Sequence, residues 1–117
     1  MSEEIIDLRE FMERVQDDRD LMIELLDIFQ QDFAEKRKVI DGAVQSKNFE
    51  QIRSIAHSLK GSSGNISAKT MHASWFQIEQ LAKNSDVIGI AEVLGQLDKM
   101  FKELETYAIR LKSELKK

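Results

Sequence analysis

The residues best suited to chemistry in this 117-residue sequence form one short run, His57-Ser58-Leu59-Lys60-Gly61-Ser62-Ser63-Gly64-Asn65. Near neutral pH a histidine side chain is largely uncharged, so one ring nitrogen keeps a free lone pair that can attack an electrophile. A lysine one helical turn away can hold the oxygens of a phosphoryl group, which makes phosphorus the electrophile that suits this pair. The run therefore predicts a nucleophilic imidazole at His57, with Lys60 as its charge partner.

A helical projection of the run separates its polar and glycine positions from the apolar ones. At about 100° per residue, one face carries His57, Lys60, Gly61 and Gly64. The opposite face carries the apolar residues Ile52, Ile55, Leu59 and Ile66. Ser62 and Ser63 project toward the core side, where their hydroxyls can bond to the preceding turn. His57 is therefore expected to be exposed to water.

The two glycines of the run need a physical reason, since each costs roughly 0.5–1 kcal/mol relative to alanine inside a helix. Gly61 and Gly64 share the face of His57 and have no side chain that would block access to the ring. We interpret both as steric clearance that lets a partner reach the imidazole. The face around His57 is therefore expected to be a docking surface.

The elements that must position this run are helices. The chain has no proline, and its apolar residues recur at spacings of three and four. Cap signals at Asp7, at Asn48 and in the cluster Asn84-Ser85-Asp86 mark helix starts, and another helix follows Asp17 and Asp18. Glu10 is expected to reach back to Asp7. The predicted helices are a short one from Asp7, then about 19–46, 49–65, 68–83 and from 87 onward. We predict an all-α fold: an antiparallel up-and-down four-helix bundle with a short additional N-terminal helix.

Composition narrows the function further. The length suits one domain spanning 1–117, the net charge of −4 disfavours nucleic acid and acidic membrane surfaces, and the absence of cysteine excludes disulfides and thiolate metal sites. No apolar run suits a membrane span, and the start Met1-Ser2-Glu3-Glu4 does not resemble a secretory signal. We therefore expect a cytoplasmic protein, and we also expect it to be a monomer. Because no ATP-binding loop or metal motif is present, the domain cannot phosphorylate itself and must receive a phosphoryl group from a partner.

The segment His57-Ser58-Leu59-Lys60-Gly61-Ser62-Ser63 resembles the H-x-L-K-G-S-S core of histidine phosphotransfer (HPt) domains, the carriers of multistep two-component phosphorelays. The resemblance continues through Asn65-Ile66, Ala68 and Ile78-Glu79, and it covers most of the chain. It implies a four-helix bundle whose histidine takes a phosphoryl group from the aspartyl phosphate of one receiver domain and passes it to another. The implied partners are receiver domains of response regulators or hybrid sensor histidine kinases. No cofactor is implied for this chain, and Mg²⁺ is expected in the partner's receiver domain.

The resemblance also implies roles for individual residues. His57 would be the phosphoryl acceptor and Lys60 its charge partner. Glu79 lies where the family often has Gln or Glu, hydrogen-bonding the ring nitrogen that is not phosphorylated; its other interpretation is an ordinary solvated carboxylate. Lys83, one turn further, is expected to add positive charge. The expected docking surface around the site comprises Gly61, Gly64, Lys83, Phe76 and Phe11, with Met12 as a further candidate.

Three further positions carry smaller expectations. The family usually has glycine where Ser67 stands, and we expect Ser67 to cap the next helix. Trp75 replaces smaller residues of the family and is expected to pack in the core. His72 lacks the motif that follows His57, so we expect a surface or lightly packed histidine.

Two functions of different classes fit these observations. The first is a protein without kinase activity of its own that carries a phosphoryl group on His57 between receiver domains. The alternative is a helical interaction module that binds a receiver domain, or another partner, without phosphotransfer.

Overall fold

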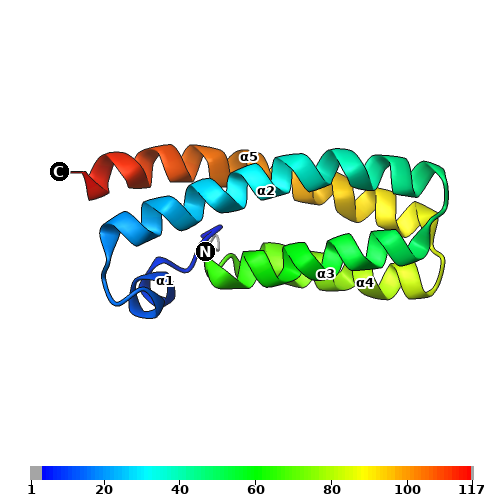
Figure 1. Ribbon diagram of the computed structural model, residues 1–117, viewed down its shortest axis with the longest axis horizontal. Coiled ribbons are helices and arrows are strands. Elements are labelled where there is room, and N and C mark those ends of the chain that lie inside the picture. The colour runs from blue at the N-terminus through cyan, green and yellow to red at the C-terminus, as the bar shows by residue number, and fades with distance from the viewer. Residues whose placement is uncertain (1–3, 117) are drawn as a thin grey trace.

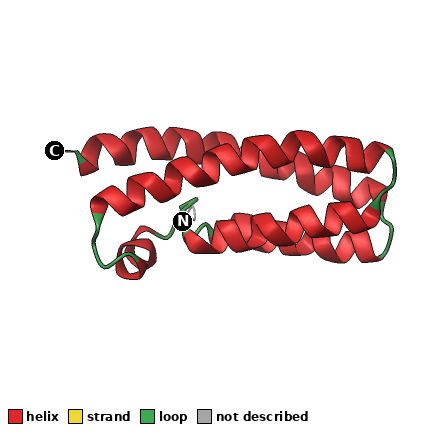
Figure 2. Ribbon diagram, viewed as in Figure 1, coloured by secondary structure: helices red, strands yellow, loops and turns green. Residues whose placement is uncertain are grey.

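Residues 4–116 fold into five helices joined by short turns (Figure 1 and Figure 2). This computed structural model describes residues 4–116; Met1 to Glu3, which weighed against a signal peptide, and Lys117 lie outside the described residues. Residues 4–116 contain no strand. The helices are α1 (Leu8–Arg14), α2 (Arg19–Gln45), α3 (Phe49–Asn65), α4 (Lys69–Lys83) and α5 (Val87–Leu115). The predicted all-α fold is confirmed.

The four long helices form an antiparallel up-and-down bundle (Figure 1). Each turn between them has only three residues, and such short connections make neighbours antiparallel. Each helix packs against the next, α5 returns to α2, and α3 and α4 share the most extensive contact. The result is an elongated molecule of 47 × 29 × 21 Å. A histidine on α3 is therefore displayed along the length of the bundle rather than at its end.

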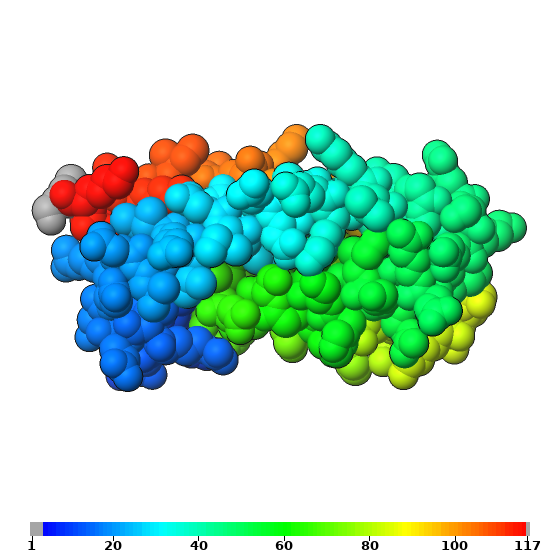
Figure 3. Space-filling model, in the orientation of Figure 1, coloured from blue at the N-terminus to red at the C-terminus, as the bar shows by residue number. Residues whose placement is uncertain are grey.

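The short helix α1 covers an end of the bundle that α3 and α4 do not reach. At about 1.5 Å per residue, the 27 residues of α2 and 29 of α5 extend well beyond the 17 of α3 and 15 of α4. In Figure 1 and Figure 3, α1 lies beneath this overhang, next to the start of α2. The N-terminal residues buried there are Ile5, Ile6, Phe11 and Val15. The amide of Asp7 also donates to the carbonyl of Ser67 (2.9 Å), which fixes the start of α1 against the α3–α4 turn.

The predicted helix starts are confirmed at four positions. A side-chain oxygen at each accepts a hydrogen bond from the backbone amide three residues on: Asp7, Asp18, Asn48 and Asp86. The expectation that Glu10 reaches back to Asp7 is wrong. The Glu10 carboxylate instead pairs with Lys69 (2.7 Å) and Arg14 (3.1 Å), because the amide of Asp7 is already bonded to the α3–α4 turn. Glu10 therefore serves the contact between α1 and α4.

The turns after α2, α3 and α4 share one conformation. Lys47, Ser67 and Ser85 have φ values of 55°, 57° and 54°, in the left-handed region that favours glycine. Each amide there bonds three residues back, as Ser67 does to Gly64 (3.0 Å), and the next bonds five residues back. The prediction that Ser67 caps α4 is therefore wrong. The N-cap residue is Ala68, which has no side-chain hydrogen bond to the helix. The left-handed backbone explains why glycine suits position 67.

The aromatic core lies behind α3 and α4. Phe33 of α2 stacks on Phe101 of α5 with ring centroids 4.1 Å apart, and its edge meets Trp75 of α4 at 5.8 Å. Trp75 is fully buried, which confirms its predicted place in the core. Across the far side of the bundle, Arg37 binds both carboxylate oxygens of Asp98 (2.8 and 3.0 Å) and links α2 to α5. The core thus fixes α4 from behind and leaves its outer face free to form a site.

The turn after α2 provides a test of this backbone account. Replacing Lys47 by glycine removes the cost of a left-handed side-chain-bearing residue and is expected to raise the free energy of unfolding by about 0.5–1 kcal/mol. The control is Lys38→Gly, at an exposed interior position of α2, which is expected to lower it by about 1 kcal/mol. Equilibrium urea unfolding measures both. A Lys47→Gly variant no more stable than the wild type would contradict the account.

Candidate functional site

The imidazole of His57 stands on the outside of the bundle. Its side chain is 71% exposed, midway along α3. The buried residues of that helix face the other way: Ile52, Ala56, Leu59 and Ser63. The predicted exposure of the ring is therefore confirmed, and a second protein can reach it from solvent.

Three charged or polar side chains meet where α3 contacts α4. Glu79 of α4 places Oε2 at 3.4 Å from His57 Nδ1 and Oε1 at 2.7 Å from Lys60 Nζ. Glu79 is only 11% exposed and Lys60 only 21%, so both charges lie against the protein. The prediction that His57 and Lys60 lie on the same face of α3 is confirmed, since both contact Glu79. Glu79 is a nearly buried partner of both residues, so its interpretation as a solvated carboxylate is wrong.

The carboxylate of Glu79 determines which nitrogen of His57 is free. An ionised carboxylate can only accept hydrogen bonds, so the proton of the neutral ring belongs on Nδ1, which faces it. Nε2 then carries the free lone pair. The exposed ring is therefore oriented as a nucleophile through Nε2.

Glu79 is anionic near neutral pH. Its partial burial acts to raise the pKa, but the hydrogen bond and positive charge of Lys60, with a smaller contribution from His57, outweigh burial, and the pKa of Glu79 is lowered from 4.5. A negative group beside the ring favours any state in which the imidazole becomes positively charged. The site therefore suits a reaction that places positive charge on the ring of His57.

Phe76 forms the apolar border of the site. Its ring is 49% exposed, and the Lys60 ammonium lies 5.1 Å from the ring centroid, a cation–π distance. The ring of Phe76, on α4, thus lies beside the Lys60 ammonium and helps to hold it at the site. Lys83, one turn beyond Glu79, is exposed at the end of α4. Both residues are accessible, and their docking roles stay predictions.

The two glycines of the motif have different surroundings. A Cβ added at Gly61 would meet nothing within 4 Å, so this position is open, as the clearance interpretation requires. A Cβ added at Gly64 would lie 3.3 Å from Nδ1 of His72. The interpretation of Gly64 as clearance for a partner is therefore wrong, because the space beside it is filled by a side chain of α4. His72 itself is exposed, so the expectation of a surface or lightly packed histidine is confirmed, but its contact with Gly64 was not predicted.

The expected docking role of Phe11 is also wrong. Phe11 is fully buried, because α1 turns its apolar side into the overhang of α2 and α5. Met12 is half-buried against the same core. Because α1 has only seven residues, its sequence pattern alone could not show whether Phe11 faces the core or the surface. The accessible apolar group beside the site is therefore Phe76.

On its other flank, α3 is held by a polar cluster from α2. Lys36 Nζ donates to Ser58 Oγ (2.6 Å) and pairs with Asp32 (2.9 Å). Ser62 Oγ donates to Asp32 (3.3 Å) and to the carbonyl of Ser58 (3.2 Å), so its expected bond to the preceding turn is confirmed. The i, i+4 spacing of Asp32 and Lys36 indicates an ion pair within α2. Nothing in the sequence indicates that this pair contacts Ser58 of α3. This cluster helps to fix the rotation of α3.

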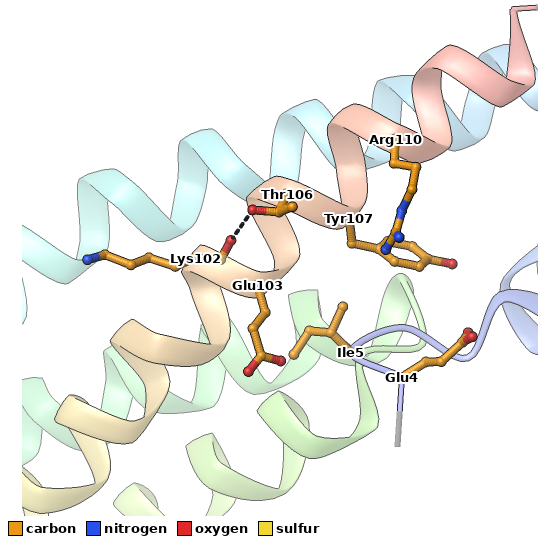
Figure 4. A pocket seen from close by; sticks show the side chains of 7 residues that line it. All are labelled: Glu4, Ile5, Lys102, Glu103, Thr106, Tyr107 and Arg110. Atoms are coloured by element: carbon orange, nitrogen blue, oxygen red, sulfur yellow. Dashed lines mark hydrogen bonds between the residues drawn. The ribbon is translucent and has the colours of Figure 1, made fainter. Parts of the chain in front are cut away.

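The surface of residues 4–116 has a hollow at the site and another near the N-terminal segment. One, of about 360 Å³, borders the imidazole and is lined by Glu50, Arg53, Ser54, His57 and Glu79. The other, of about 500 Å³, lies between the N-terminal segment and α5 (Figure 4). In it Arg110 lies over the ring of Tyr107 (5.9 Å to the centroid), whose pKa is raised by burial. Only the first hollow contains residues of the site, and Arg53 adds a cation at its rim.

Two negative findings apply to the described residues. Within 4–116, no three His, Cys, Asp or Glu side chains are grouped so as to hold a metal ion. The same part of the chain has no helix that combines the length and apolar character needed to cross a membrane.

Comparison with known proteins agrees with the geometry. The site comprises an exposed histidine on an antiparallel helical bundle, flanked by a lysine and a nearly buried carboxylate. The family model of the Hpt domain matches residues 24–107, well over half of the chain, and the chain belongs to this family. Neither the curated proteins nor the solved structures gave a match. The match begins within α2, so α1 lies outside the part that defines the family.

The lowered pKa of Glu79 predicts a pH-dependent contribution to stability. A carboxylate whose folded pKa lies below its unfolded value of 4.5 stabilises the fold above that pH, and the contribution is lost as the pH falls through the folded pKa. The difference in unfolding free energy between wild type and Glu79→Gln is therefore expected to shrink below about pH 4.5. Urea unfolding between pH 3 and 7 measures it, with Glu92→Gln, an exposed site on α5, as the control for losing one charge. A difference that grows toward low pH would contradict the ion-pair account.

Proposed function

We propose that this chain carries a phosphoryl group on Nε2 of His57 between aspartate side chains of receiver domains. The observation that supports this most directly is the exposed ring whose Nδ1 faces the carboxylate of Glu79 at 3.4 Å. Membership of the Hpt family supports receiver domains as the partners. The protein would act as a carrier and not as a kinase.

The transfer begins with attack of the Nε2 lone pair on the phosphorus of an aspartyl phosphate. The N–P bond forms, the P–O bond to the aspartyl carboxylate breaks, and the free carboxylate leaves with the electron pair. Because Nδ1 keeps its proton, the phosphorylated ring becomes a cation, which the negative charge of Glu79 stabilises. The reverse attack by a second aspartate returns the ring to its neutral form. Glu79 therefore serves both directions.

Lys60 supplies positive charge for the incoming phosphoryl oxygens. Its ammonium is held by Glu79 at 2.7 Å and lies on the same face as His57. Before transfer the pair of Lys60 and Glu79 is electrically balanced; the arriving phosphoryl group adds negative charge that the ammonium can share. Lys83, exposed one turn beyond Glu79, would add a weaker, longer-range attraction.

Docking would centre on the open surface beside the ring. Gly61 leaves the approach to His57 clear, and the half-exposed ring of Phe76 offers an apolar contact. The metal ion of the reaction, Mg²⁺, would be held by the receiver domain, and this chain would need no cofactor of its own. We also propose that residues 1–117 act as one domain and work as a monomer.

The phosphoryl-acceptor role of His57 is tested by incubation with phosphorylated receiver domains, or with kinase, receiver and ATP together. Acid-labile, alkali-stable label is expected on the wild type and is expected to be absent from His57→Gln, which should fold normally because the ring is exposed. Demonstrable binding to several competent donors with no label would overturn the carrier role. That result would instead favour the helical interaction module.

The docking role of Gly61 is tested by adding bulk. Because a side chain at this position meets open space, Gly61→Leu is expected to keep the wild-type fold while slowing transfer from a receiver by on the order of tenfold to a hundredfold. The matched control is Gly95→Leu, an equally open helix position on α5, which should transfer at the wild-type rate. Stopped-time labelling with a phosphorylated receiver measures both. Equal rates for the two variants would show that the partner does not approach over Gly61.

A further inference from the structure

His72, on α4, is bonded to the backbone of α3. Its Nδ1 lies 2.8 Å from the carbonyl oxygen of Lys60. A carbonyl can only accept a hydrogen bond, so the ring nitrogen donates and Nδ1 of His72 carries a proton. In a helix this carbonyl also accepts from the amide four residues on, that of Gly64. One oxygen of α3 therefore serves both its own helix and the neighbouring one.

Gly64 makes this bond possible. An alanine there would place its Cβ 3.3 Å from Nδ1 of the His72 ring, which is tighter than most such contacts, and 3.7 Å from Cε1, which is an ordinary contact distance. The ring would have to move away from the carbonyl by a few tenths of an ångström. Glycine at position 64 therefore leaves room for the His72 ring beside α3, although glycine is less favourable than alanine inside a helix.

Three residues of α4 act together on Lys60. His72, Phe76 and Glu79 are spaced i, i+4 and i+7, so they lie on one face of the helix. His72 bonds the Lys60 carbonyl, Phe76 lies 5.1 Å from its ammonium, and Glu79 pairs with that ammonium at 2.7 Å. Both the backbone and the side-chain end of Lys60 are therefore held by α4.

We propose that His72 is a positioning residue for phosphoryl transfer, acting through Lys60; this rests on the proposed function of His57. Its hydrogen bond to the Lys60 carbonyl fixes the position of α4 along the axis of α3 near the site. The same displacement sets the distances from Glu79 to His57 Nδ1 and to Lys60 Nζ. The ring of His72 takes no part in the reaction itself.

The test uses a donor that needs no docking. Phosphoramidate transfers its phosphoryl group to Nε2 of His57: the new N–P bond forms as the P–N bond of the donor breaks and ammonia leaves. The rate of His57 labelling therefore reports on the site and not on receiver binding. Loss of one hydrogen bond in His72→Ala is expected to slow labelling of His57 by about two- to tenfold. His72→Asn, which keeps an N–H donor near the position of Nδ1, is expected to restore most of the rate. Gln77→Ala, an exposed residue of α4, is the control and should match the wild type.

A second measurement keeps the positioning role testable if no phosphoryl group is transferred. The ¹⁵N spectrum of the imidazoles is expected to show His72 as the Nδ1-protonated tautomer, and His72→Ala is expected to shift the side-chain signals of His57 and Lys60. An Nε2-protonated His72, unmoved signals, or a His72→Ala rate equal to that of the wild type would overturn the proposal. A wild type that accepts no phosphoryl group from any donor, with the NMR results as expected, would overturn the proposed function and leave the positioning contact established.

Discussion

The site depends on one carboxylate that is nearly buried between two helices. Burying the charge of Glu79 at 11% exposure is unfavourable unless it is paired, and both of its partners, Lys60 and His57, come from α3. The interaction that compensates this charge therefore also orients the imidazole. Fold and chemistry are coupled here, because any shift of α4 along α3 changes the ring's hydrogen bond and the lysine's charge partner at once.

The surrounding structure limits such shifts while leaving the outer face of α3 open. Lys36 of α2 holds α3 through Ser58 on one flank, and the α3–α4 turn is held by α1 through the bond from Asp7 to Ser67. Behind the site, the fully buried ring of Trp75 fills the core. Restraint on the inner sides of α3 together with openness at Gly61 suits the carrier role proposed for His57, in which the ring meets one partner after another.

What the sequence predicted well follows from periodicity within single helices. The spacing of apolar residues predicted the four long helices, the buried stripe of α3 and the exposed position of His57, because a helical projection separates inward from outward positions. What it missed depends on contacts between helices. Gly64 appeared open in projection, yet His72 of the next helix fills the space beside it, and Phe11 appeared available, yet it lies beneath two overhanging helices. The sequence predicts a cap at Ser67, because residue type alone does not show its left-handed backbone.

In the proposed function, the Glu79 carboxylate on α4 selects which nitrogen of the His57 ring is phosphorylated. The most direct measurement is a ³¹P–¹⁵N correlation spectrum of the ¹⁵N-labelled, phosphorylated protein, which identifies the ring nitrogen bonded to phosphorus. The account predicts a single phosphoryl group on Nε2 of His57, with a proton retained on Nδ1 opposite Glu79. A phosphoryl group on Nδ1, or on a residue other than His57, would contradict it.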